Sequence, residues 1–221
     1  TDLAAIARAL KKAGSQALLH TDAVQGFLKL PFSAKTLGAD LISISGHKIH
    51  APKGIGALYI KSGLKLKPMI LGGSQEYGLR AGTESMPLIA ALGAACELGK
   101  KNLDANFRHM AELKAYAMES LSAAIPEIRF LDTAAPHVLS LSLPGWRSEV
   151  LMNFLETREI YVSKSSACKK GGRSHVLEAM GLDAKVIDGA IRIGLCRYNT
   201  AEDIEALAEA LGDARNTLAH R

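Results

Sequence analysis

Lys48 lies in a loop between two apolar segments, a position that suits a lysine that bonds covalently to a ligand. The motif Ser45-Gly46-His47-Lys48 directly follows the apolar run 41–44, and a second apolar run occupies residues 54–60. Two short β-type segments around a Gly/Pro-containing loop place the Lys48 amine at a strand end, where open α/β sheets gather ligands. An amine held there can condense with an aldehyde. The alternative for Lys48 alone is a solvated surface lysine; Lys53, offset from the motif in the same loop, is assigned to the surface.

A carboxylate follows the preceding apolar segment. Asp22 comes directly after residues 17–21. Schiff-base lysines bound to pyridoxal phosphate usually have an acidic partner that keeps the pyridine nitrogen protonated. Such a pair shifts the pKa values of both groups toward their charged forms. Asp22 is the candidate partner, and its alternative role is that of a turn or cap residue after a strand.

Four short motifs occur in order along the chain. They are HTDAVQ at 20–25, SGHK at 45–48, RAGT at 80–83 and SAC at 166–168. Together they resemble the signatures of the cysteine desulfurases, within the class V aminotransferase group of fold-type I pyridoxal-phosphate enzymes. The resemblance runs from one end of the chain to the other. Family members are nearly twice as long, so the chain resembles their C-terminal part.

The resemblance implies a role for each motif residue toward the cofactor, pyridoxal 5'-phosphate. Lys48 binds its aldehyde, while Ser45 and His47 help to hold its phosphate. Gln25 hydrogen-bonds its phenolic oxygen, unless that side chain is only a polar surface amide. Thr83 is lent to the phosphate site of a neighbouring subunit, which implies a homodimer with shared active sites.

Cys168 separates a desulfurase from other enzymes of the group. The segment 164–173 is small, polar and glycine-containing, which predicts a mobile loop. Nearby Lys169, Lys170 and Arg173 favour the thiolate, the nucleophilic form of the side chain. By resemblance, this thiolate takes sulfur from L-cysteine, leaving L-alanine and a persulfide on Cys168. The alternative is an inert loop thiol.

An arginine lies inside the alternating run 191–195. Burying an unpaired guanidinium is costly, and its planar fork suits a carboxylate, so Arg192 needs an anionic partner. The resemblance implies that Arg192 binds the α-carboxylate of the substrate, and Arg197 is the weaker candidate. Family members commonly have glycine where Ser165 stands. Their ring-stacking histidine and further phosphate ligands have no counterpart here, so we expect the 221-residue chain alone to be inactive and to bind cofactor poorly.

Composition is that of a globular enzyme rather than a membrane or secreted protein. With 221 residues and 48% hydrophobic content, the chain can bury a sizeable core, and no apolar stretch approaches the roughly 20 residues of a membrane helix. Three cysteines without a close pair argue against a disulfide framework and against a zinc site, so we expect no metal and a reducing cytoplasm. The formal charge of +5 is spread out, which indicates a solvated surface and not a nucleic-acid site.

The pattern of elements predicts an α/β protein. The alternation of helix and strand indicates a βαβ-type layer, and the resemblance implies that residues 1–99 form the second half of a fold-type I large domain, with a mixed, largely parallel sheet. Residues 100–221 are expected to form an α+β small domain that carries the cysteine loop. The predicted elements are a helix over 2–12, two long helices or one bent helix over 83–124, strands at 137–143, 160–162 and 191–195, and a final helix from a Thr200/Asp203 capping box toward Leu218.

Three functions stay open from the sequence. A cysteine desulfurase would pass its persulfide sulfur to an iron–sulfur scaffold or to a thiolation pathway. Another class V pyridoxal-phosphate enzyme would keep Lys48, Asp22 and Arg192 without needing Cys168, and a selenocysteine lyase would use the same thiol and lysine. The third hypothesis is a non-catalytic module for dimerisation or partner binding.

Overall fold

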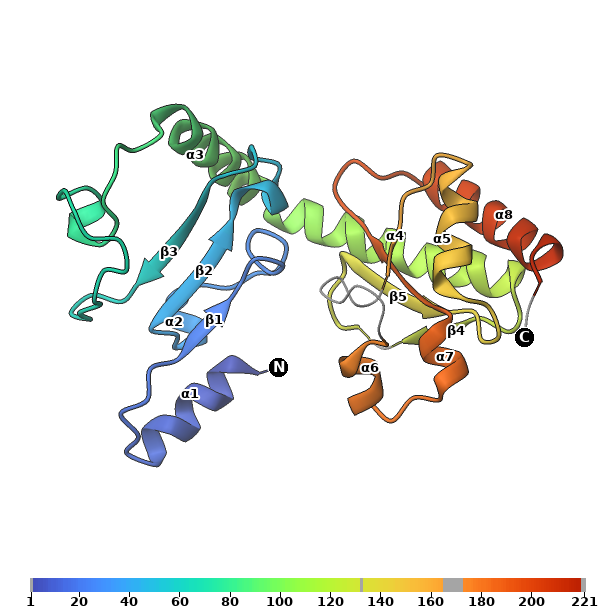
Figure 1. The fold of residues 1–221 in the computed structure, drawn as a ribbon, viewed down its shortest axis with the longest axis horizontal. Helices are drawn as coiled ribbons and strands as arrows, with labels where there is room; N and C mark the ends of the chain where they lie inside the picture. The colour runs from blue at the N-terminus through green and yellow to red at the C-terminus, as the bar shows by residue number, and fades with distance from the viewer. Residues whose placement is uncertain (1, 132, 165–172, 220–221) are drawn as a thin grey trace. The chain divides into compact units, whose positions relative to one another are not determined.

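The chain divides into two compact units. The computed structural model describes residues 2–131, 133–164 and 173–219. The first unit is Thr1–Asp104 and the second is Ala105–Arg221 (Figure 1). No helix within the described ranges is both long and apolar enough to cross a bilayer.

A three-stranded mixed sheet forms the centre of the first unit. Its strands are β1 (His20–Asp22), β2 (Leu41–Ser45) and β3 (Gly56–Ile60), in that order across the sheet. β1 runs parallel to β2, and β3 runs antiparallel to it. The expected mixed sheet is confirmed, with one parallel and one antiparallel pairing. The two strands predicted on either side of the lysine motif are β2 and β3.

Short helices complete this unit: α1 (Leu3–Lys12), α2 (Ala34–Leu37), the 3₁₀ helices η1 (Gly46–Ile49) and η2 (Glu76–Gly78), and α3 (Met86–Lys101). The Asp2 carboxylate caps α1 by accepting the Ala5 N–H at 2.8 Å. The helical stretch predicted over 83–124 is two helices, because Asn102 caps the C-terminus of α3 and α4 (Leu103–Ala124) begins directly after it.

Charges tie the three strands together at one end of the sheet. Asp40, just before β2, accepts the Leu19 N–H at 3.0 Å and pairs with Lys61, just after β3, at 2.9 Å. The Leu19 N–H and then the Lys61 ammonium lower the pKa of the Asp40 carboxyl, and Asp40 in turn raises the pKa of Lys61. These three residues, the strand clamp, lie at the start of β2, whereas the lysine motif follows the other end of β2.

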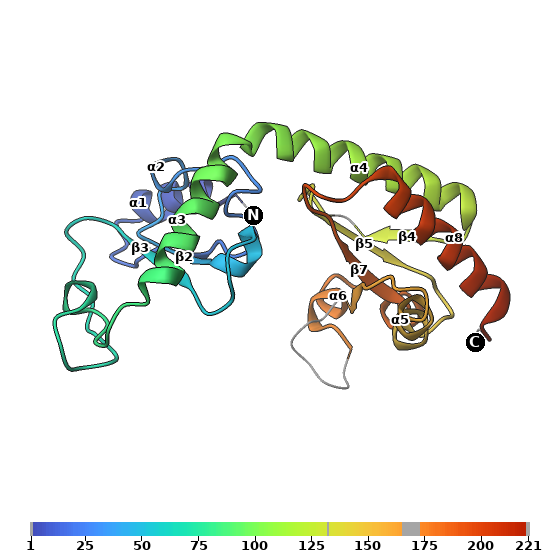
Figure 2. The ribbon, with the colours of Figure 1, turned by 90° about the horizontal axis from the view of Figure 1, so that it is seen from above.

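The second unit is built on an antiparallel sheet. Its strands are β4 (Arg129–Leu131), β5 (Val138–Ser142), β6 (Ser163–Lys164) and β7 (Ala190–Gly194), in the order β4-β5-β7-β6. Its helices are most of α4, then α5 (Ser148–Glu156), α6 (His175–Ala179), α7 (Ala184–Asp188) and α8 (Ala201–Thr217). Figure 2 shows α4 and α6 on opposite sides of the strands.

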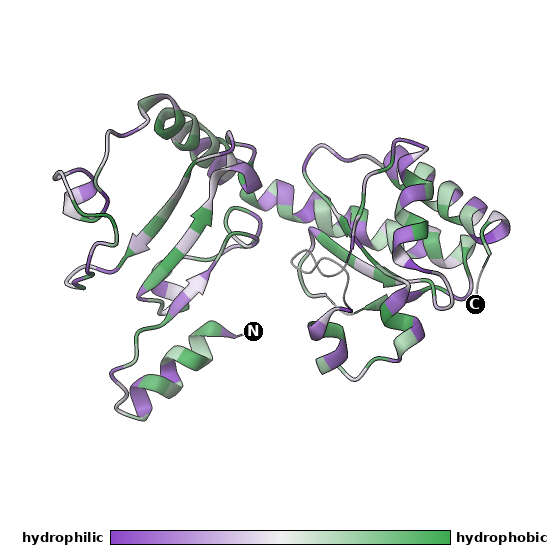
Figure 3. Ribbon diagram, viewed as in Figure 1, coloured by the Kyte–Doolittle hydropathy of each residue, from purple (hydrophilic) through white to green (hydrophobic). Residues whose placement is uncertain are grey.

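The core of the second unit follows from strand alternation. Leu139 and Leu141 of β5 lie in register with Ile193 and Ile191 of β7, so all four side chains share one face. Helices α4, α5 and α8 bury that face with a mostly Leu and Ala core. A smaller cluster that includes Leu177 packs residues of α6 and α7 with β7. Figure 3 shows hydrophobic residues on β2 and β5 of the two units.

Two details of this unit test the sequence predictions. The Thr200/Asp203 capping box is confirmed, with the Asp203 carboxylate accepting the Thr200 N–H at 3.1 Å. The strand predicted over 160–162 is wrong, because the strand begins only at Ser163. Ile160 and Val162 pack against the core from irregular backbone, which explains their apolar character.

Candidate active site

Lys48 lies in η1, which continues directly from the end of β2. The Gly46 N–H donates to the Ile55 carbonyl at 2.9 Å, and the Ala51 N–H donates to the Gly46 carbonyl at 3.0 Å, which closes the loop on itself. His50 ends η1 in the left-handed conformation, with φ of 67°. Within the part of the chain that the structure describes, the half-buried Lys48 has no hydrogen-bond or ion-pair partner.

Close packing fixes the path of this loop. A Cβ added at Gly46 would lie 2.8 Å from the Ile55 Cγ2 and 3.0 Å from the Ile55 carbonyl oxygen, so only glycine fits there. A Cβ at Gly56 would lie 2.6 Å from the Ile44 carbonyl oxygen. Helix α3 also packs against η1. The amine of Lys48 therefore extends from a backbone that has little freedom to shift.

A hydroxyl and an imidazole accompany the amine. Ser45 Oγ and His47 Nδ1 share a hydrogen bond of 2.8 Å. Ser45 is the last residue of β2 and His47 lies within η1, so the pair spans the junction of strand and helix. Either group can donate to a phosphate oxygen in one of its protonation or rotamer states.

Register brings four polar side chains to one face of the first sheet. Asp22 of β1 lies beside Ser43 of β2, and alternation puts His20 on the face of Asp22 and Ser45 on the face of Ser43. His20 Nε2 and Ser43 Oγ share a hydrogen bond of 2.8 Å. His20 therefore joins β1 to β2 through its side chain. The sequence did not indicate Ser43, because its partnership depends on the register.

Asp22 also takes the turn role considered as its alternative. Its Oδ1 accepts the Val24 N–H at 2.9 Å, which starts the turn over 24–29. A carboxylate has two oxygens, so this bond leaves Oδ2 available to a ligand. Gln25 is exposed within that turn.

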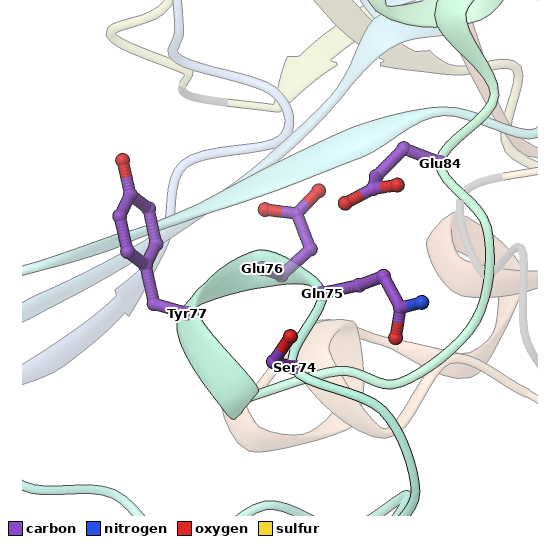
Figure 4. A pocket seen from close by; sticks show the side chains of 5 residues that line it. All are labelled: Ser74, Gln75, Glu76, Tyr77 and Glu84. Carbon is purple, nitrogen blue, oxygen red and sulfur yellow. The ribbon is translucent and has the colours of Figure 1, made fainter.

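Thr83 lies apart from this group in the hydrogen-bond network. It is exposed, and among the described residues no hydrogen bond joins it to Ser45, His47 or Lys48. Beside it lies an open hollow of about 470 Å³ lined by Ser74, Gln75, Glu76, Tyr77 and Glu84 (Figure 4). Two carboxylates in this lining would repel a phosphate, so the hollow does not suit the cofactor.

Arg192 occupies the centre of β7. Its register partners are Ser140 of β5 and Ser163 of β6. Arg192 is half-buried, and no carboxylate pairs with it among the described residues. Arg197, by contrast, donates from Nη2 to the Tyr198 hydroxyl at 2.7 Å and stacks over that ring. Arg192 is therefore the guanidinium better able to receive a carboxylate ligand.

Cys168 lies outside the described residues, as do Ser165, Lys169 and Lys170. The residues on either side are described, and both form ion pairs. Lys164 Nζ lies 2.6 Å from Glu149 Oε1. Arg173 donates from Nε and Nη2 to the two oxygens of Asp188 at 2.7 and 2.8 Å.

These ion pairs bear on Arg173, which was predicted from the sequence to favour the thiolate form of Cys168. Hydrogen bonds from Arg173 hold the pKa of the Asp188 carboxyl below its ordinary value, and Lys164 does the same for Glu149. The charge of Arg173 is thus already matched by a carboxylate. Each acid lies 15 positions from its partner, so no short-range spacing could have indicated the pairing.

The two other cysteines are free thiols. Both Cys96 and Cys196 are half-buried. Burial raises the pKa of the Cys96 thiol, which makes it a poor nucleophile. In the described ranges no group of three or more His, Cys, Asp or Glu side chains is placed to hold a metal ion.

Residues 1–207 match the family model for aminotransferase class-V. The chain belongs to the aminotransferase class-V family. Over 93% of its length it is 38% identical to a cysteine desulfurase of Nostoc sp., of which it covers 52%. It is 37% identical over 89% of its length to the cysteine desulfurase IscS of Methanosarcina thermophila, of which it covers 50%.

Solved structures of the family share the fold. A NifS-like protein from Rickettsia africae aligns over 98% of this class V chain and 58% of its own, with a TM-score of 0.88 and 32% identity. The fold-type I assignment is therefore supported over the 98% of the chain that aligns. The chain spans about half the length of the curated relatives that it matches.

Proposed function

We propose that this class V chain is part of a cysteine desulfurase that uses pyridoxal 5'-phosphate to convert L-cysteine to L-alanine, with the sulfur left as a persulfide on Cys168. The observation that carries the proposal is the setting of Lys48. An amine without a partner in the described chain follows the end of β2, on a sterically fixed loop, and the carboxylate of Asp22 ends the neighbouring parallel strand. The two curated relatives described above bear the name cysteine desulfurase.

The residues of the first unit suit the chemistry of this cofactor. Lys48 would bind its aldehyde, Ser45 and His47 its phosphate, Asp22 its pyridine nitrogen and Gln25 its phenolic oxygen. When bound, pyridoxal phosphate supplies a conjugated ring that accepts an electron pair from the substrate. Asp22 would keep a proton on the ring nitrogen, and Lys48 would carry a proton to and from the substrate α-carbon.

Sulfur transfer would then fall to the second unit. Arg192 would hold the α-carboxylate of L-cysteine. The Cys168 thiolate would attack the substrate sulfur, forming a sulfur–sulfur bond as the carbon–sulfur bond breaks. The released electron pair would be protonated at the β-carbon, giving alanine and a persulfide with no external oxidant or reductant.

The working unit is proposed to be a homodimer with shared active sites. Thr83 would serve the phosphate site of the neighbouring subunit, which suits its exposure and its separation from Lys48 in the hydrogen-bond network. The persulfide sulfur would pass to an iron–sulfur scaffold or another acceptor protein. Free thiols at Cys96 and Cys196 suit a reducing cytoplasm.

The test combines a spectrum with product analysis on the purified protein, expressed with any natural upstream sequence. Lys48→Ala should abolish the visible absorbance that pyridoxal phosphate gives when bound to a lysine amine. Cys168→Ala should lose sulfide and alanine release from L-cysteine, while the control Cys96→Ala keeps both. Retained turnover in Cys168→Ala would favour another class V enzyme, and an unchanged spectrum in Lys48→Ala would overturn the proposal.

Chain length leads to one more expectation. About half of the cofactor pocket would come from residues that this chain does not contain, so we expect the 221 residues alone to turn over cysteine poorly. Robust turnover by the isolated chain would contradict this. Binding to partner proteins without any cofactor absorbance would instead favour the non-catalytic module.

A further inference from the structure

Asp22 lies on the open face of the first sheet. The opposite face is packed, because Ile42 of β2 is 5% exposed and belongs to a small apolar core. Alternation along β1 puts Thr21 on the packed face and both His20 and Asp22 on the other, where they are exposed. A ligand can therefore approach Asp22 from the open face.

The side-chain bond between His20 and Ser43 runs diagonally across this open face. In the β1–β2 register His20 lies beside Leu41. Ser43 is instead the register partner of Asp22. The imidazole nevertheless bonds to Ser43, with 2.8 Å between Nε2 and Oγ. His20 therefore reaches along the strands toward Asp22 and holds the hydroxyl of the residue beside it.

Backbone pairing fixes β1 without help from this bond. The Ala23 N–H donates to the Ser43 carbonyl at 2.9 Å, and the Leu41 N–H donates to the Leu19 carbonyl at 3.1 Å. A hydrogen bond between exposed side chains contributes little to stability, because water competes for both partners. The His20–Ser43 bond thus does more for the direction of the Ser43 hydroxyl than for the fold.

The direction of that hydroxyl decides what Asp22 meets. A hydroxyl can accept one hydrogen bond while its single proton is donated to another group. Asp22 Oδ1 already accepts the Val24 N–H, and an ionised carboxylate can only accept, so Oδ2 needs donors as well. If the imidazole donates to Ser43 Oγ, the Ser43 proton is left for a group beside it. Because neighbouring strands lie about 4.8 Å apart, the carboxylate of Asp22 is within reach.

Resting on the proposed function, we propose that His20 and Ser43 are positioning residues for Asp22. The His20 imidazole donates from Nε2 to Ser43, whose hydroxyl proton is thereby directed to the Asp22 carboxylate. This second donor, in addition to the Val24 N–H, orients the carboxylate toward the pyridine nitrogen of the cofactor, since one carboxylate oxygen can accept from two donors. His20 and Ser43 act through Asp22 and not on the cofactor itself.

The experiment compares two ligands on the protein expressed with any natural upstream sequence. One is pyridoxal phosphate, and the other is its deaza analogue, in which a C–H group replaces the ring nitrogen, so that only the first ligand can use Asp22. The measured quantity is the ratio of the two dissociation constants, from absorbance titration. A variant that merely loosens the fold weakens both ligands alike and leaves this ratio unchanged.

Ser43→Ala and His20→Leu should each lower the preference for pyridoxal phosphate over the analogue by about three- to tenfold, which is the size of one hydrogen bond. Ser43→Thr keeps the hydroxyl and His20→Gln keeps an N–H donor, so both should restore most of the preference. The double variant Ser43→Ala/His20→Leu should lose no more than Ser43→Ala alone, because the imidazole acts through the hydroxyl. Thr21→Val, in the same strand on the packed face, is the matched control and should leave the ratio unchanged.

An unchanged ratio in Ser43→Ala or in His20→Leu overturns the proposal, as does an additive loss in the double variant. Amide exchange of the cofactor-free variants should show β1 still paired with β2, and loss of that pairing would make the bond structural and also overturn the proposal.

Asp22→Asn in the same titration separates this failure from a failure of the proposed function. If Asp22→Asn lowers the preference while Ser43→Ala and His20→Leu do not, the positioning role is wrong and Asp22 still serves the ring nitrogen. If Asp22→Asn also leaves the ratio unchanged, or if the unsubstituted protein binds neither ligand, the proposed function fails together with the positioning role.

Discussion

The two units are of similar length but bury very different cores. Among the described residues, the first unit buries six apolar side chains, of which four are alanines, whereas the second buries 25. The first unit also exposes more large hydrophobic side chains than the second, including Met69 at 97% and Tyr77 at 98%. The unit that carries Lys48 therefore has little burial of its own to stabilise it.

The smaller core of the first unit follows partly from the polar residues of the candidate active site. In the first unit one face of the sheet carries His20, Asp22, Ser43 and Ser45, so these positions contribute polar groups instead of core. In the second unit, by contrast, one face of β5 and β7 carries apolar side chains that are buried in the core. Exposed apolar side chains of the first unit are suited to burial against further protein, in agreement with the proposed dimer.

Core truncation should separate the two units most strongly. Leu155→Ala in α5 removes a side chain that is 0% exposed and should lower the free energy of unfolding by about 2–5 kcal/mol. Leu58→Ala in β3, where the side chain is 47% exposed, should cost less than about 1 kcal/mol. Urea denaturation followed by circular dichroism measures both. Equal losses would contradict the contrast between the cores.

The lysine loop should be the exception within the weaker unit. Gly46→Ala drives a methyl group into Ile55 and should cost about 1–3 kcal/mol, seen as faster amide exchange in β2 and β3. Gly93→Ala in α3 is the matched control, because a Cβ there meets nothing within 4 Å and alanine favours a helix. If Gly46→Ala left amide exchange in β2 and β3 unchanged, the loop would not be sterically fixed.

Helix capping offers a finer comparison between α8 and α3. Asp203→Ala removes the carboxylate that accepts the Thr200 N–H at 3.1 Å in the capping box of α8 and should cost about 1 kcal/mol. Ser85→Ala, at the start of α3, should change little because the Ser85 side chain makes no cap hydrogen bond. Thermal unfolding of both variants tests the difference, and a larger effect at Ser85 would reverse it.

The smallest expected effect is a pH dependence of the strand clamp. The folded pKa of Asp40 lies below its unfolded value, so the clamp contributes stability above the ordinary carboxyl pKa of about 4 and loses it as the pH falls through the lower, folded value. Asp40→Asn should flatten this acid dependence of amide exchange in β1 and β2. If amide exchange in Asp40→Asn kept the same dependence on acid pH, the strand clamp would not be the cause of that dependence.

Local patterns in the sequence predicted much of the fold. The helix at the N-terminus, the strands around the lysine motif and the capping box at Thr200 all depend on neighbours within a few residues. The strand predicted at 160–162 failed because apolar residues can fill a core from irregular backbone. The His20–Ser43 bond and the Arg173–Asp188 pair join residues 23 and 15 positions apart, so they could be found only from the fold.

The most direct test of the account is to locate the lysine that bonds to pyridoxal phosphate. The protein would be mixed with the cofactor at a limiting concentration, reduced with borohydride and mapped by peptide mass spectrometry. The account predicts that the label concentrates on Lys48 and disappears from that peptide in Lys48→Arg. A label on Lys53, or one spread evenly over the exposed lysines, would contradict it.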